Sequence, residues 1–144
     1  MRRFWTLLTV GAMALFYTTA AQAEPVRVTV DAPAKVPIVR SPEALTRRTG
    51  AEQVVVTVSG YEPSPAGPVQ IVALAMCDGK ERALGRFAVL PATGFGAGDK
   101  HRHQHFGLTL PAECGGAEHL TVRLIPSRGD GSGAHADIAG AEIN

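Results

Sequence analysis

A chain of 144 residues with 14 Lys and Arg against 13 Asp and Glu carries almost no net charge. This balance argues against nucleic acid or an anionic membrane surface as the partner, because both select proteins with a marked excess of positive charge. The length is that of one domain with a core of moderate size.

The N-terminus is typical of a secretory signal peptide covering residues 1–23. A pair of arginines gives it a positive start, residues 4–16 form an apolar segment, and Ala21-Gln22-Ala23 is a cleavage site of small residues. The apolar segment is shorter than the roughly 20 residues that cross a bilayer, so cleavage is favoured over a retained anchor. We therefore expect a mature domain, residues 24–144, that is periplasmic or secreted and has no membrane contact after cleavage.

The mature part predicts an antiparallel all-β domain. Apolar and polar residues alternate with a period of two, and turn residues separate the runs. A count of seven or eight short strands predicts a β-sandwich or a jelly-roll-like barrel. The expected strands are residues 26–30, 36–39, 53–59, 69–76, 86–90, 103–110, 119–125 and 138–143.

Prolines and glycines mark the expected connections. Residues 31–42 carry three prolines, so we expect an edge or connecting segment there, closed by a single helical turn from Ser41. Residues 60–68 contain three more prolines and predict a stiff external loop. Asp78-Gly79-Lys80 is a turn signal, and residues 127–133 predict an exposed, glycine-rich hairpin connection.

The chain has two cysteines, Cys77 and Cys114. In a protein expected to reach an oxidising compartment, such a pair predicts an intramolecular disulfide with a structural role. Free thiols that ligate copper are the alternative, but no CxxC spacing supports it.

Three segments carry a resemblance to a known family. Residues 85–91 (GRFAVLP), 120–126 (LTVRLIP) and 138–143 (IAGAEI) resemble the strands GSFVNLP, LTVTLVP and IGGIEI. These strands belong to the C-terminal covering domain of plant polyphenol oxidases and related tyrosinases. The resemblance extends upstream over nearly the whole mature chain, and residues 69–72 stand where the family has its KFDV signature, which is absent here.

The resemblance implies the cover of an oxidase without the oxidase itself. The copper domain of that family uses six histidines on a helical bundle, whereas this chain has five histidines and no helical pattern to carry them. We therefore expect a free-standing, non-catalytic accessory protein that covers, inhibits or assists copper loading of a tyrosinase-type binuclear copper oxidase. A structural β-sandwich module with neither role is an alternative.

A covering domain needs a side chain that reaches into its partner. Phe95 lies among glycines in the segment 93–98, so a flexible backbone could project it outward as a plug. Tyr61, beside the proline-rich loop, is a second candidate. The alternative is that Phe95 folds back onto its own core.

Three histidines, His101, His103 and His105, alternate along the chain. On an extended strand they share one face, and imidazole suits copper or zinc. His119 or His135 could complete such a site. A stand-alone periplasmic copper or zinc binder is therefore a further hypothesis, against surface histidines that merely titrate.

Catalysis by the chain itself has little support. Ser127, Asp130 and Ser132 lie near His135 in sequence, but a catalytic triad needs a rigid, convergent scaffold rather than an exposed glycine-rich loop. We expect that the chain is not an enzyme.

Overall fold

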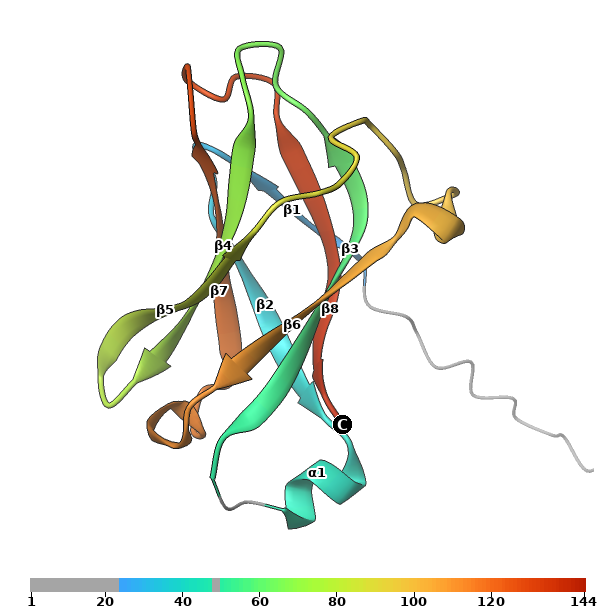
Figure 1. The fold of residues 1–144 in the computed structure, drawn as a ribbon. Helices are drawn as coiled ribbons and strands as arrows, with labels where there is room; N and C mark the ends of the chain where they lie inside the picture. Colours follow the sequence, from blue (N-terminus) through green and yellow to red (C-terminus); the bar gives the residue numbers. More distant parts are fainter. Residues whose placement is uncertain (1–23, 48–49) are drawn as a thin grey trace, which may run out of the picture.

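The structure, a computed structural model, describes residues 24–47 and 50–144, so the expected signal peptide lies outside the described residues. Eight strands form a sheet that is nearly closed into a barrel, and the all-β prediction is confirmed (Figure 1). Hydrogen bonding joins the strands in the order β5-β4-β7-β2-β8-β3-β6, and β1 also pairs with β8. The strands are β1 (Val26–Thr29), β2 (Ala34–Arg40), β3 (Glu52–Glu62), β4 (Val69–Cys77), β5 (Lys80–Phe87), β6 (Gln104–Leu110), β7 (His119–Pro126) and β8 (His135–Ile143).

Strand β2 holds the two halves of the barrel together, whereas the sequence predicts only an edge or connecting segment there. Its first half pairs antiparallel with β7 as far as Pro37, and from Ile38 onward it pairs parallel with β8. Pro37 lacks an N–H group and stands where the strand changes partners, so its missing donor falls at the crossover. The fold is therefore mixed rather than purely antiparallel.

The core is built by alternate residues of the central strands. In β3, Val54, Val56 and Val58 are fully buried, and β-branched side chains suit a pleated surface that is covered on one face. Leu120 and Val122 of β7 and Ile138 of β8 are buried equally well. The period-two pattern of the sequence thus identifies the inward face correctly.

The strand bounds differ from the expected ones by one to three residues at most ends, and by six at the start of β5. Strand β5 begins at Lys80, directly after a tight turn in which Asp78 and Gly79 have φ values of 49° and 80°. This left-handed pair allows a hairpin with a very short loop, so β5 starts earlier than the expected 86–90 strand and ends at Phe87. Strand β8 likewise begins at His135 rather than at residue 138.

Two short helical segments brace the barrel ends. Helix α1 (Pro42–Thr46) is the single turn expected from the sequence, with the Ser41 hydroxyl accepting a hydrogen bond from the Ala44 N–H. The 3₁₀ segment η2 (Ala112–Cys114) carries Cys114, which forms a disulfide with Cys77 at the end of β4. The predicted cysteine pairing is therefore confirmed.

The barrel has one seam, between the terminal strands β5 and β6. The rings of Phe87 and Phe106 stack across it with centroids 4.1 Å apart. Next to them, Gly85 is closely covered, because an added Cβ would lie 2.7 Å from the end of the Leu108 side chain, which would have to shift. Side-chain packing thus closes the barrel where no ladder of hydrogen bonds joins the strands.

Candidate functional site

The functional hypotheses placed on residues 93–105 fall mainly on the β5–β6 loop, residues 88–103. It leaves β5, crosses the end of β3, forms the 3₁₀ segment η1 (Lys100–Arg102) and enters β6. Two of its apolar side chains, Val89 and Phe95, are buried. The loop therefore has its own anchors in the core.

Phe95 points into the protein, so the prediction that it projects as a plug is wrong. Its backbone N–H and C=O each form a 2.9 Å hydrogen bond with Tyr61, which extends the edge of β3 beyond β6. Residues paired in this way place their side chains on the same face, and the Tyr61 ring is buried. Phe95 accordingly shares the core, with 8% of its surface exposed.

Tyr61 is also part of the packing rather than an outward contact. Its exposed fraction is 4%, and burial raises the pKa of its phenol by disfavouring the charged form. Both aromatic candidates from the sequence thus stabilise the loop instead of reaching a partner.

Arg102 clamps the middle of the loop. Its guanidinium donates to the carbonyl oxygens of Thr93 and Gly94 and to the Thr93 hydroxyl, at 2.6–3.1 Å. The same group lies 4.9 Å from the centroid of the Phe95 ring, within cation–π range. One side chain therefore fixes the glycine-rich stretch that the sequence predicts to be flexible.

Gln104 clamps the start of the loop. Its side-chain amide donates to the Leu90 carbonyl at 2.6 Å and accepts from the Leu90 N–H at 3.3 Å. Gln104 thus holds both the N–H and the C=O of Leu90. Leu90 itself is 74% exposed. Sequence reasoning missed this residue because Leu90 reads as the inward end of an apolar strand, and its orientation depends on where β5 ends.

The histidine row is broken, because its first part is helical rather than extended. His101 lies in η1, and the His103 N–H donates to the Lys100 carbonyl, so the strand begins only at Gln104. The period-two argument that gives the three imidazoles a common face does not apply to this turn. The expected shared face of His101, His103 and His105 is therefore wrong.

Each of the three imidazoles has its own surroundings. His101 is exposed, while the His105 Nδ1 lies 2.9 Å from the Thr57 hydroxyl on β3. His103 is half-buried beside Phe95, with ring centroids 6.5 Å apart, and its Nε2 is enclosed without a hydrogen-bond partner. Within residues 24–47 and 50–144, no three His, Cys, Asp or Glu side chains form a group that could hold a metal ion.

The other two histidines lie elsewhere in the barrel. His119 is opposite Pro37 on β2, and His135 lies between Thr29 and Glu62. Neither is on the strand or the loop that carries the histidine row.

The polar residues near His135 serve local structure. The Asp130 carboxylate accepts the Ser132 N–H at 2.9 Å, which lowers the pKa of the carboxyl group, and the Ser132 carbonyl accepts the Ser64 hydroxyl at 2.7 Å. These contacts hold the β7–β8 connection against the β3–β4 connection. Ser64, Asp130 and Ser132 therefore have a structural role in joining the two connections.

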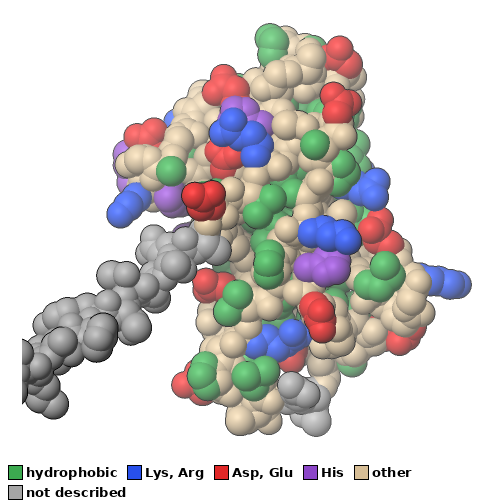
Figure 2. Space-filling view, turned by 180° about the vertical axis from the view of Figure 1, so that it is seen from behind, with side chains coloured by type: hydrophobic (Ala, Val, Ile, Leu, Met, Phe, Trp, Pro, Cys, Tyr) green, Lys and Arg blue, Asp and Glu red, His purple; other side chains and the backbone are tan. Residues whose placement is uncertain are grey.

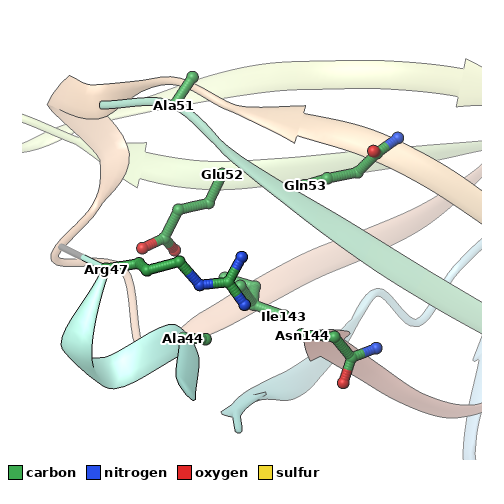
Figure 3. A pocket seen from close by; sticks show the side chains of 7 residues that line it. All are labelled: Ala44, Arg47, Ala51, Glu52, Gln53, Ile143 and Asn144. Atoms are coloured by element: carbon green, nitrogen blue, oxygen red, sulfur yellow. The ribbon is translucent and has the colours of Figure 1, made fainter. Parts of the chain in front are cut away.

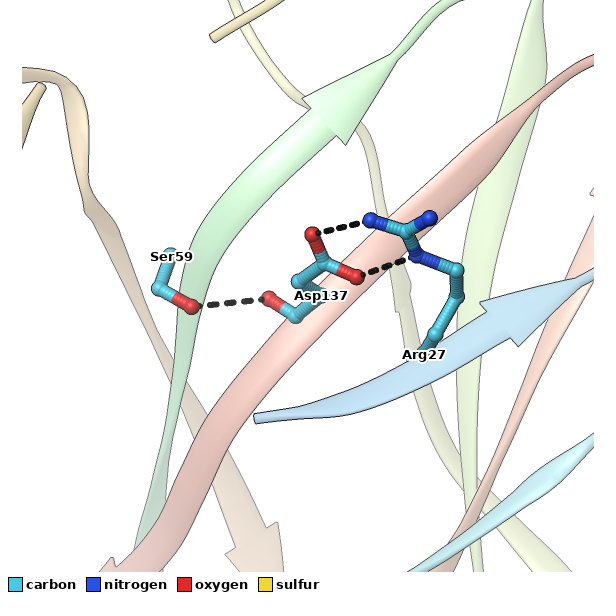
Figure 4. Close-up of polar contacts among 3 residues, drawn as sticks. All are labelled: Arg27, Ser59 and Asp137. Atoms are coloured by element: carbon cyan, nitrogen blue, oxygen red, sulfur yellow. Dashed lines mark hydrogen bonds and ion pairs between the residues drawn. The ribbon is translucent and has the colours of Figure 1, made fainter. Parts of the chain in front are cut away.

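A second polar cluster joins three strands of the sheet (Figure 4). Arg27 of β1 donates twice to the Asp137 carboxylate on β8, at 2.8 and 3.1 Å, and the Ser59 hydroxyl of β3 donates to the Asp137 carbonyl at 3.4 Å. The hydrogen bond from Arg27, more than its charge, lowers the pKa of Asp137. Ser59 stands at a bulge where β3 and β8 shift register.

Several hollows in the described part of the chain are open to solvent. One of about 300 Å³ lies between α1, the start of β3 and the C-terminus, and Arg47 and Glu52 extend into it (Figure 3). Glu52 is engaged by Arg40, with N and O atoms 3.5 Å apart. A larger, mainly apolar hollow of about 720 Å³ lies where β1 and β2 diverge along β8, and Val39, Lys100 and His103 are among its lining residues. Viewed from behind, hydrophobic side chains gather along the middle of the molecule with charged groups around them (Figure 2).

Comparisons with known proteins assign the chain to no family. No protein-family model matches the chain, and no curated protein or solved structure matches it significantly. In the described part of the chain, no helix is long and apolar enough to cross a membrane.

Proposed function

We propose that the mature chain is a non-catalytic exported accessory domain that acts by binding a partner protein through its β5–β6 loop. One observation carries the proposal: a loop of glycines and polar residues is held firmly along its length. Gln104 fixes its start, Arg102 its middle and the Tyr61–Phe95 pairing its crossing of β3. Ordering a loop in advance lowers the entropy cost of binding, which is the advantage of such bracing.

The partner that the sequence resemblance suggests is a tyrosinase-type binuclear copper oxidase. The all-β fold and the disulfide Cys77–Cys114 suit a compact exported cover. On this proposal the domain covers the oxidase, inhibits it or assists its copper loading, and the chemistry belongs to the oxidase.

The test uses the protein as the cell exports and processes it. The purified domain is mixed with a tyrosinase-type oxidase from the same organism, chosen because its chain lacks a covering domain of its own. We expect saturable binding together with a change in diphenol oxidation or in copper uptake by the oxidase. A lack of binding at concentrations well above micromolar would overturn the proposal.

A further inference from the structure

We propose that the apolar hollow between β1, β2 and β8 is a binding site for an uncharged, mainly apolar small molecule that carries a hydroxyl group. Its volume of about 720 Å³ falls within the range of small-molecule sites in proteins, about 300–1,000 Å³. This site does not require the oxidase partner, so its test is separate from that of the proposed function.

The hollow exists because β8 changes partners along one edge. Strand β1 pairs with β8 as far as Ile138, and β2 pairs with it only from Ala141 onward. Ala139 and Gly140 therefore have no partner strand on that side, and Figure 1 shows β1 and β2 diverging toward β8. Ala139 also forms a bulge opposite β3, and bulges are frequent beside functional sites. The opening thus follows from the topology of the sheet.

The floor of the hollow is open and its walls are apolar. A Cβ added at Gly140 would meet no atom within 4 Å. Val36 and Ile138 line the hollow and belong to the buried core, so the hollow reaches the core between the strands. Val39 of β2 adds an apolar side chain that is 60% exposed. A concave, mainly apolar surface is what small-molecule sites present.

The charged side chains of the lining have mixed signs. They are Glu24, Glu142 and Lys100, all exposed, and none takes part in the ion pairs found in the described part of the chain. Asp99 and His101, on either side of Lys100, are exposed but do not line the hollow. A ligand with a full charge of either sign would meet a like charge here and would lose hydration against the apolar walls. The lining therefore favours an uncharged ligand.

Two further polar side chains line the hollow, Ser59 and His103. The Ser59 hydroxyl donates its proton to the Asp137 carbonyl at 3.4 Å, so its oxygen remains free to accept a hydrogen bond. A ligand with a hydroxyl donor satisfies that oxygen. His103 belongs to the β5–β6 loop, so a ligand in the hollow contacts the loop as well as the sheet.

The experiment measures the binding of 1-naphthol to the exported, processed domain by isothermal titration calorimetry. We expect one site with a Kd on the order of 0.1 mM. Two charged molecules with the same ring system, 1-naphthoate and 1-naphthylmethylammonium, should bind at least about tenfold more weakly. The processed protein is used because Glu24, the first residue of the expected mature domain, lines the hollow.

Four variants test the location of the site. Gly140→Leu fills the floor and should weaken 1-naphthol binding at least about tenfold. Gly116→Leu is the matched control and should bind like the wild type, because a Cβ at Gly116 also meets no atom within 4 Å and this residue does not line the hollow. Val39→Ser and Ser59→Ala should each weaken binding about threefold to tenfold, through lost apolar contact and a lost hydrogen bond respectively. Urea midpoints of both glycine variants should match that of the wild type, since neither position has a left-handed φ.

Each outcome decides one part of the proposal. Absence of saturable 1-naphthol binding up to about 1 mM would overturn it, and so would wild-type affinity in both Gly140→Leu and Val39→Ser. Equal or tighter binding of either charged molecule would refute the uncharged class. An unchanged affinity in Ser59→Ala would refute the hydroxyl contact. Because no oxidase is present, none of these results bears on the proposed function.

Discussion

Removing the disulfide tests the packing account of this small barrel most severely. Cys77 and Cys114 are both buried and lie 37 residues apart, joining the end of β4 to η2 between β6 and β7. In the chain-entropy model, opening a loop of this size lowers the free energy of unfolding by about 4 kcal/mol. For a domain of this length, that loss lowers Tm on the order of 15 °C.

The assay is urea denaturation of the wild type and of Cys77→Ala/Cys114→Ala, each with and without reductant. We expect the reduced wild type to unfold at the same urea concentration as the double variant, and the variant to be insensitive to reductant. The urea midpoint of the wild type could also stay unchanged on reduction, although its thiols become accessible. That result would refute the reasoning that the crosslink closes the barrel end.

Three further predictions follow from the loop and the sheet. Phe95→Ala should lower the free energy of unfolding by about 3 kcal/mol or more, because it leaves a cavity under Arg102; a change below about 1 kcal/mol in urea denaturation would contradict the inward position. Arg27→Ala should lower stability at neutral pH. Since Arg27 depresses the pKa of Asp137 below 3.8, the stability that this pair contributes is present above about pH 4 and is lost as the pH falls through the folded pKa. Wild-type and Arg27→Ala denaturation midpoints should therefore converge in acid, and a constant difference down to pH 2 would contradict the assignment. Copper(II) titration with the mature protein should show no stoichiometric uptake at micromolar metal, because the three imidazoles lie in separate environments; tight binding that His103→Ala abolishes would contradict this.

The fold could be predicted from the sequence where local pattern alone decides. The alternating valines of β3 and the turn residues at Asp78 and Gly79 mark an inward face and a hairpin without any tertiary information. The role of β2 could not be predicted, because a proline disfavours a central strand and only the change of partner at Pro37 makes it compatible with one.

The sequence draws attention to the β5–β6 loop but does not predict how its side chains are held. The glycines around Phe95 predict a flexible backbone. Arg102 and Tyr61 hold that backbone in place, and both contacts join residues whose proximity depends on the fold. The histidine row fails for a different reason, since the turn at residues 100–102 shortens β6 by one residue. The exposure of Leu90 can be recognised only once the end of β5 and the Gln104 contact are known.

The most direct test of the central claim is the equilibrium binding of the exported wild-type domain to a tyrosinase-type oxidase from the same organism. The account predicts saturable wild-type binding at micromolar concentrations. Absence of wild-type binding would contradict the accessory function.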